Sequence, residues 1–204
     1  GLSLSHETLR LMHNDSLNIF LFNKKKRNLF LSKHFLSVIQ LNLNNVSSSI
    51  PKSLANLSNL TTLQLSNCGL TNVFPKGIFQ MQKLKILDVS YNLDLHGSLP
   101  NFPQVGHLTL NLSNTNFSGQ LPGTISNFKQ LAIVDLCSCQ FNGTLPVSLS
   151  RLCQLVHLNF LSNNFTTPLP SVNMSNNLNS LFFSGKSSIN PLHTSITTRA
   201  YSFS

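Results

Sequence analysis

The 204-residue chain has no tryptophan, only five acidic residues and no long apolar run. A membrane-spanning helix needs roughly 18 consecutive apolar residues, so the sequence predicts no membrane span. The sequence motifs H-E-x-x-H and G-x-S-x-G and the phosphate-binding loop are also absent. These motifs mark common catalytic and nucleotide-binding sites. We therefore expect no catalytic residue, no metal site and no cofactor.

The few charged residues are mostly basic. Fourteen Lys and Arg face five Asp and Glu, which gives a formal net charge of +9. Part of the excess is the run Lys-Lys-Lys-Arg at residues 24–27. Such runs can bind nucleic acid or acidic membranes, but this one has no interleaved aromatic residues. A solvated loop is therefore favoured, and no nucleic-acid partner is expected.

One sequence motif recurs with a period of 24 residues, except for one unit of 23 residues. Apolar residues stand at positions one, four and six of the units, except that one unit begins with His107; Asn, Cys or Thr stands at position nine, and a proline follows. Six units begin at Leu36, Leu60, Leu84, His107, Leu131 and Leu155. A period of 20–29 residues with this spelling is typical of leucine-rich repeats. The expected fold is an α/β solenoid, with a curved parallel β-sheet on the concave face and short helical or irregular segments on the convex side.

The extent of the repeats predicts the domain organisation. Alternating apolar and polar residues at positions three to seven predict one short strand per unit, and stacked units bury one another's apolar sides. About six units account for residues 36–178. We expect residues 1–35 to form a degenerate N-terminal repeat or an irregular flank. Residues 179–204 are expected to form a degenerate last unit and a disordered tail.

Position nine carries small side chains that can donate a hydrogen bond. The chain must turn inward there, so these side chains are expected to form a structural ladder that satisfies buried carbonyls. The ladder residues are Asn44, Cys68, Asn92, Thr115, Cys139 and Asn163. Cys68 and Cys139 are three units apart, about 14 Å, which is too far for a disulfide. With Cys137 and Cys153, they are expected to remain thiols.

The outward positions of the predicted strands are polar and nearly uncharged, which suits hydrogen bonding to a peptide or glycan. Ligand contacts on this concave face are expected from Gln64, Ser66, Asp88, Ser90, Tyr91, Asn111, Asn114, Asp135 and Asn159. Simple solvation of these faces is an equally good interpretation. Asp88 and Asp135 should lie about 10 Å apart, whereas glycosidase carboxylates lie roughly 5 to 9.5 Å apart. This spacing argues against an enzyme.

The sequon N-x-S/T occurs nine times. A modest excess over chance supports a glycosylated, extracellular setting, and most of the chosen candidates fall in the loop half of the unit, where a glycan would not block the sheet. The candidate glycosylation sites are Asn56, Asn59, Asn116, Asn142 and Asn164.

The segment at 110–122, L-N-L-S-N-T-N-F-S-G-Q-L-P, resembles the plant-specific class of leucine-rich repeats. Such repeats occur in the ectodomains of plant receptor kinases and receptor-like proteins. Residues 59–75 and 97–103 look like receptor-like proteins of the tomato Verticillium-wilt-resistance type. The resemblance covers about residues 31–183.

This resemblance implies the ectodomain of a plant cell-surface immune receptor, lying outside the plasma membrane or secreted. Its concave face would bind an extracellular peptide, protein or glycan, and a co-receptor kinase would supply signalling. The signal peptide, the cysteine-containing cap, the membrane span and the kinase domain are not recognisable in the sequence, so an internal fragment is expected. A secreted inhibitor of a pathogen cell-wall hydrolase and a non-functional truncated receptor copy remain alternatives.

Overall fold

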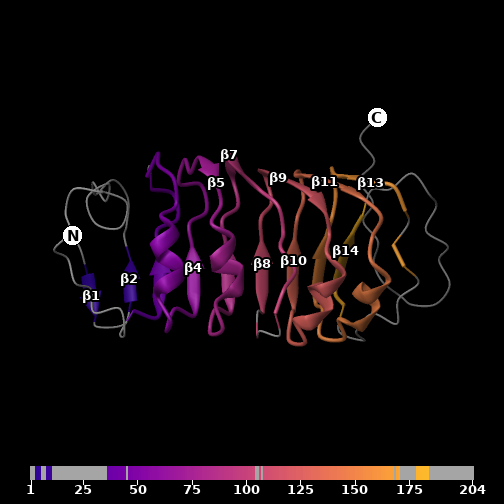
Figure 1. Cartoon of the computed structure of the whole chain (residues 1–204), viewed down its shortest axis with the longest axis horizontal. Helices are drawn as coiled ribbons and strands as arrows, with labels where there is room; N and C mark the ends of the chain where they lie inside the picture. The colour runs from indigo at the N-terminus through magenta and orange to yellow at the C-terminus, as the bar shows by residue number, and fades with distance from the viewer. Residues whose placement is uncertain are drawn as a thin grey trace.

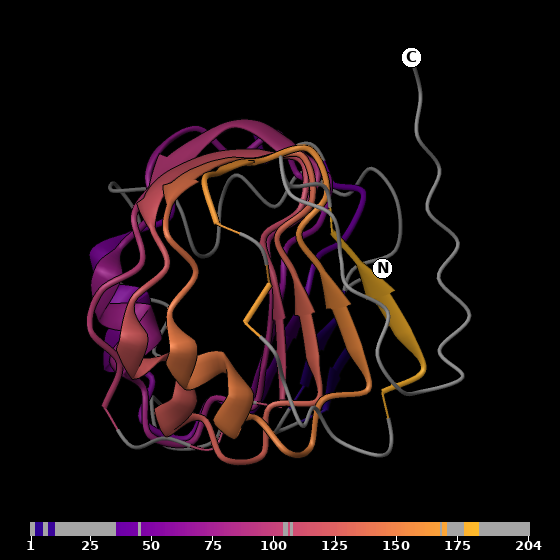
Figure 2. The ribbon, with the colours of Figure 1, turned by 90° about the vertical axis from the view of Figure 1, so that its right-hand side faces the viewer.

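A computed structural model describes residues 3–5, 8–10, 36–44, 46–103, 106, 108–167, 169–170 and 178–183, with the backbone alone at 3–5 and 8–10. The chain coils into an elongated stack in which successive units stand side by side (Figure 1). Viewed along the stack, strands line one side of each coil and helices line the opposite side (Figure 2). The predicted solenoid is therefore confirmed.

One strand per unit builds the main sheet. Its nine strands, in spatial order, are β1 (Ser3–Ser5), β2 (Thr8–Arg10), β3 (Val38–Gln40), β4 (Thr62–Gln64), β6 (Ile86–Asp88), β8 (Thr109–Asn111), β10 (Ile133–Asp135), β12 (His157–Asn159) and β14 (Ser180–Phe182). Only the β1–β2 pair is antiparallel; the other pairs are parallel. From β3 to β12 the central residue of each strand is fully buried, as at Leu63 and Leu110, because the apolar face of each strand turns inward.

A second parallel sheet, which the sequence did not predict, follows the inward turn of each unit. Its five strands are β5 (Asn72–Val73), β7 (Asn92–Gly97), β9 (Thr115–Gln120), β11 (Gln140–Gly143) and β13 (Asn164–Phe165). These segments were expected to be irregular. They are only two to six residues long, too short for a clear alternation, and become strands because equivalent segments of neighbouring units lie together.

Short 3-10 helices occupy the convex side, as expected for this fold. They are η2 (Lys52–Asn56), η3 (Lys76–Gln80), η4 (Gly123–Asn127) and η5 (Val147–Arg151). The residue before each helix is a proline of the repeat, with φ between −68° and −70° and an extended ψ. Because proline fixes φ and has no N–H to satisfy, it is suited to a helix start. The repeated proline therefore sets where each helix begins.

The unit at Leu84 is irregular, and the neighbouring units compensate. It has an extra residue before Leu95, and the pairing of β7 with β9 shifts register between Asn92 and His96. No helix follows Pro100 in the described residues of this unit. Phe102 fills the space instead, with its ring centroid 4.4 Å from that of Phe128. Its backbone amide and carbonyl bond to side chains of the next unit.

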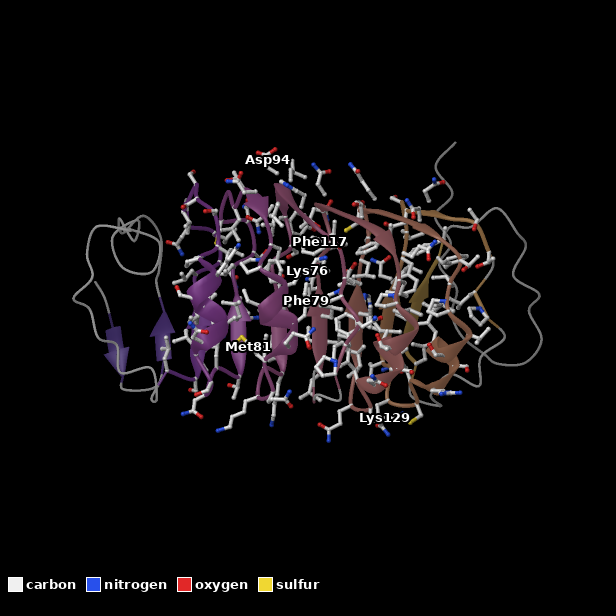
Figure 3. All side chains as sticks on the ribbon, in the orientation of Figure 1. Lys76, Phe79, Met81, Asp94, Phe117 and Lys129 are labelled. Carbon is white, nitrogen blue, oxygen red and sulfur yellow. The ribbon has the colours of Figure 1, made fainter. Side chains whose placement is uncertain are left out.

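Five phenylalanine rings from three successive units pack in the interior. They are Phe74, Phe79, Phe102, Phe117 and Phe128, all 3% exposed or less. The Phe117 ring lies 5.6 Å from Phe74 and 6.2 Å from Phe79, centroid to centroid. Figure 3 shows Phe79 and Phe117 inside the stack, with Asp94 and Lys129 at opposite rims. Aromatic packing between units thus ties the middle of the solenoid together.

Candidate functional site: the concave face of the main sheet

The concave face ends at a row of left-handed turns. At position eight of each unit the backbone φ is positive, between 52° and 62°. The six residues are Leu43, Asn67, Tyr91, Asn114, Ser138 and Ser162. Asn tolerates this conformation, whereas a bulky side chain does so at a cost. Tyr91 is nevertheless 58% exposed and Leu43 56% exposed, so both project from this rim into solvent.

The Asn92 side chain joins two units at the inward turn. Its Nδ2 donates to the carbonyls of Leu65, Val89 and Ser90 at 2.8–3.0 Å. Its Oδ1 accepts the amides of Cys68 and Leu70 at 3.0 and 2.9 Å. The side chain is 1% exposed, so these bonds satisfy groups that water does not reach.

The other asparagines of the ladder repeat this geometry in part. Asn163 donates to the carbonyl of Leu136 at 2.7 Å and accepts the amide of Phe141 at 3.0 Å. Asn44 donates to the carbonyl of Leu41 at 2.8 Å. Its buried Oδ1 has no hydrogen-bond partner among the described residues. In Asn92 the corresponding oxygen accepts amides of the preceding unit.

Where the ladder residue is Cys or Thr, the side chain can donate. The Cys68 thiol donates to the carbonyl of Leu41 at 2.9 Å, and the Cys139 thiol donates to that of Leu112 at 3.1 Å. Thr115 also donates to Leu112, at 2.6 Å. Burial raises the pKa of the Cys68 thiol to about 11 and raises that of Cys139. Both thiols therefore remain protonated donors. All four cysteines of the chain are free.

Position five forms a continuous row across the concave face. The strand registers align Gln40, Gln64, Asp88, Asn111, Asp135, Asn159 and Phe182. Each Asp or Asn in this row uses Oδ1 to accept the backbone amide two residues ahead, at 3.0–3.2 Å. This leaves the second oxygen or nitrogen of each side chain for other contacts. We call these aligned residues the position-five row.

Ser90 was expected to contact ligand, and the structure places it out of reach. It is only 2% exposed. Its hydroxyl donates to Asp88 Oδ1 at 2.7 Å and lies 2.9 Å from the hydroxyl of Ser66. The short side chain is therefore buried, and its hydroxyl supports Asp88.

The remaining candidate residues lie on the concave face with different exposures. Tyr91 is exposed, and the others are half-buried: Gln64, Ser66, Asp88, Asn111, Asn114, Asp135 and Asn159. Gln64 Oε1 accepts a hydrogen bond from Gln40 at 2.6 Å. The face is therefore a polar surface with few charges rather than a deep pocket.

Asp135, His157 and Ser180 come together at the C-terminal end of this face. His157 Nε2 lies 3.7 Å from Asp135 Oδ2, and His157 Nδ1 lies 2.6 Å from the hydroxyl of Ser180. Nothing in the sequence indicated that Ser180 lies beside His157, because Ser180 stands where the repeat motif fades. The 3.7 Å separation is longer than a hydrogen bond. The amide of Ser180 is occupied because it donates to Val156, so this amide does not supply an oxyanion hole.

The described part of the chain shows little sign of a metal site, a catalytic carboxylate pair or a membrane-spanning helix. No group of three or more His, Cys, Asp and Glu side chains there is arranged to hold a metal ion. Asp88 and Asp135 lie on β6 and β10 with β8 between them, which separates them by about 10 Å. None of the helices in this part is long and apolar enough to cross a bilayer.

The five candidate glycosylation asparagines lie outside the strands of the main sheet, whereas Asn111, which also stands in a sequon, lies on β8 in the position-five row. Asn116, Asn142 and Asn164 are exposed on β9, β11 and β13 of the second sheet. Asn56 is exposed at the end of η2, while Asn59 is half-buried and accepts a hydrogen bond from Lys83 at 2.6 Å. Most of residues 1–35 and 179–204, the expected flank and tail, lie outside the described residues.

Comparisons with known proteins agree with the repeat. The Leucine Rich Repeat family model matches residues 59–81, 108–128 and 130–152. Receptor-like protein 6 of Arabidopsis thaliana is 36% identical over 52% of the chain, and receptor-like protein 41 of the same plant is 31% identical over 81%. Receptor-like protein Cf-9 of Solanum pimpinellifolium is 31% identical over 50%. The chain spans only 11%, 18% and 12% of these relatives, respectively.

Solved structures give the same result. The ectodomain of the Arabidopsis thaliana receptor kinase GASSHO1/SCHENGEN3, in complex with CASPARIAN STRIP INTEGRITY FACTOR 2, superposes with a TM-score of 0.69 at 31% identity, covering 76% of this chain and 19% of that one. The Arabidopsis receptor kinase HAESA, in complex with the peptide hormone IDA and the co-receptor SERK1, gives 0.57 at 26% identity, covering 67% and 22%. The chain is therefore a leucine-rich-repeat solenoid of the plant receptor-like-protein type.

Proposed function

We propose that this chain is a non-catalytic ligand-recognition module, part of the extracellular domain of a plant cell-surface immune receptor-like protein. The observation that carries the proposal is the position-five row. It aligns polar side chains across six neighbouring units, and each Asp or Asn in it has one oxygen fixed by the backbone and another group left to bind. A solenoid face of this kind suits an extended ligand, because every unit adds a similar set of contacts.

A peptide is the ligand class that the comparisons favour. The HAESA structure contains a peptide hormone and a co-receptor, and the chain resembles that ectodomain. By analogy, an extracellular peptide, or a protein segment or glycan of similar shape, would lie on the concave face. A co-receptor kinase would bind elsewhere on the solenoid. The setting would be the outer face of the plasma membrane.

The non-catalytic part of the proposal rests on geometry. The two carboxylates of the row are about 10 Å apart, beyond the usual spacing of glycosidase pairs. The Asp135–His157–Ser180 group lacks a hydrogen bond between acid and base at 3.7 Å.

Glycans on the second sheet would be compatible with this function. Asn116, Asn142 and Asn164 are exposed on adjacent strands of that sheet, so glycans there would leave the concave face open. Mass spectrometry of the chain secreted from plant cells, before and after glycosidase treatment, tests this. Unmodified asparagines at all three positions would contradict it.

The function is tested with a synthetic library of random 12-residue peptides and the immobilised chain. Retained peptides should be lost when Thr109, at the centre of the face on β8, is replaced by Trp, which blocks the row. Circular dichroism should show that Thr109→Trp remains folded. Equal retention by both proteins would contradict binding on the concave face.

A further inference from the structure

We propose that the position-five row binds a peptide in the polyproline II conformation that carries two basic side chains three residues apart. This inference rests on the proposed function, and it names the chemistry of the ligand. Its two anchoring residues are Asp88 and Asp135, which lie in the same row on β6 and β10.

The charge of the row is the first argument. Asp88 and Asp135 are two of only five acidic residues in a chain of net charge +9. Among the described residues, neither carboxylate forms an ion pair with a lysine or arginine. The one contact in this part of the chain between either carboxylate and a basic side chain joins Asp135 to His157. Its separation of 3.7 Å leaves Asp135 Oδ2 without a close hydrogen bond. Between Gln40 and Phe182 the row holds no other charged residue, and two half-buried carboxylates there are complementary to two cationic groups.

The spacing selects the peptide conformation. Two strand intervals place the carboxylates about 9.6 Å apart along the solenoid axis. A polyproline II helix rises about 3.1 Å per residue with three residues per turn. Residues i and i+3 therefore point the same way, about 9.3 Å apart. In a β-strand, residues three apart point to opposite faces, so an extended β-peptide does not match the two carboxylates with this sequence spacing.

The residue between the carboxylates supports the same ligand. Asn111 lies on β8 between Asp88 and Asp135, and its Oδ1 accepts both the amide and the hydroxyl of Ser113 at 3.1 and 2.8 Å. Its Nδ2 is therefore directed to donate. A polyproline II backbone has no internal hydrogen bonds, so its carbonyls need such donors. At the end of the row, the half-buried Phe182 lies two strands beyond Asp135, and its ring centroid is 5.9 Å from that of His157.

The probe is a fluorescein-labelled peptide containing Arg-Pro-Pro-Arg flanked by prolines, measured by fluorescence anisotropy with the whole chain. Each ion pair between a peptide arginine and Asp88 or Asp135 should contribute about three- to fivefold to the affinity. The peptide should therefore bind about tenfold or more tightly than the same peptide with Gln in place of both Arg. Asp88→Asn and Asp135→Asn should each weaken binding about three- to fivefold. Asp94→Asn is the matched control, because Asp94 is exposed on the second sheet, and it should change nothing.

A second peptide tests the spacing. Arg-Pro-Pro-Pro-Arg turns the second arginine about 120° away in a polyproline II helix and should bind several-fold more weakly than Arg-Pro-Pro-Arg. Equal binding of the two spacings, equal binding of the Gln peptide, or no binding of Arg-Pro-Pro-Arg would each overturn the inference. The proposed function is judged separately: if library peptides without paired basic residues are retained and Thr109→Trp removes them, it stands while this inference fails.

Discussion

Replacing Asn92 by Ala tests how the ladder holds the units together. The substitution removes three donated hydrogen bonds, to Leu65, Val89 and Ser90, and two accepted ones, from Cys68 and Leu70. Because the site is 1% exposed, water does not readily replace them. Each buried amide left without a partner costs about 1–3 kcal/mol. With partial relaxation, we expect Asn92→Ala to lower the free energy of unfolding by about 3–5 kcal/mol.

Two further substitutions give the expected order of effects. Asn92→Cys restores a donor to the Leu65 carbonyl, in the same way that Cys68 and Cys139 donate to a carbonyl of the preceding unit, but it leaves the two amides unpaired. It should therefore cost less, about 2 kcal/mol. Asn127→Ala removes one side-chain bond, from a half-buried Asn to the carbonyl of Phe102, and should cost about 1 kcal/mol.

Urea unfolding followed by circular dichroism measures all three variants, with the slope of each transition compared with that of the wild type. If Asn92→Ala loses less than about 1 kcal/mol, or no more than Asn127→Ala, the ladder does not have the structural role assigned to it.

Three other predictions concern the core, a turn and the thiols. Phe117→Ala should lower the free energy of unfolding by about 3–5 kcal/mol, measured in urea, since the ring is fully buried; a loss under 1 kcal/mol would contradict the packing. Gly143→Ala should cost about 1–2 kcal/mol in the same assay, because φ is +74° and the added Cβ lies 2.9 Å from Gln120; a neutral effect would contradict this strain. Alkylation followed by mass spectrometry should modify exposed Cys153 well before Cys68. The pKa of Cys68 is raised from 9.0 to about 11, so its stabilising contribution is complete below pH 9 and is lost as the pH rises toward 11; stability that did not fall in this range relative to Cys68→Ala would contradict the burial.

The main sheet could be predicted from sequence because its signal is repeated. Leu63 and Leu110 stand at the same position of their units, so the pattern of one unit predicts the strand of another. The second sheet could not be predicted, because a segment such as Asn164–Phe165 contains two residues and forms a strand only by pairing with β11. Its structure comes from the neighbouring unit rather than from its own pattern.

The strand positions of the candidate residues could be predicted, and their role in binding stays a prediction. The alternation of the strands predicted the positions of Asp88 and Asp135, and the sheet register aligns both with Asn111. Alternation gives only the direction of a side chain, so it could not show that Ser90 is buried. It also could not place Ser180 beside His157, because the repeat spelling fades before the last strand and the pairing of β14 with β12 depends on tertiary contacts.

The central claim is that ligand binds the concave face and not another face of the solenoid. The most direct measurement compares the affinity of one library-selected peptide for two tryptophan variants: Thr109→Trp at the centre of the concave face, and His96→Trp on the exposed second sheet. The account predicts that Thr109→Trp abolishes binding and that His96→Trp leaves the affinity within twofold of the wild type. The opposite pattern, with binding lost only in His96→Trp, would contradict it.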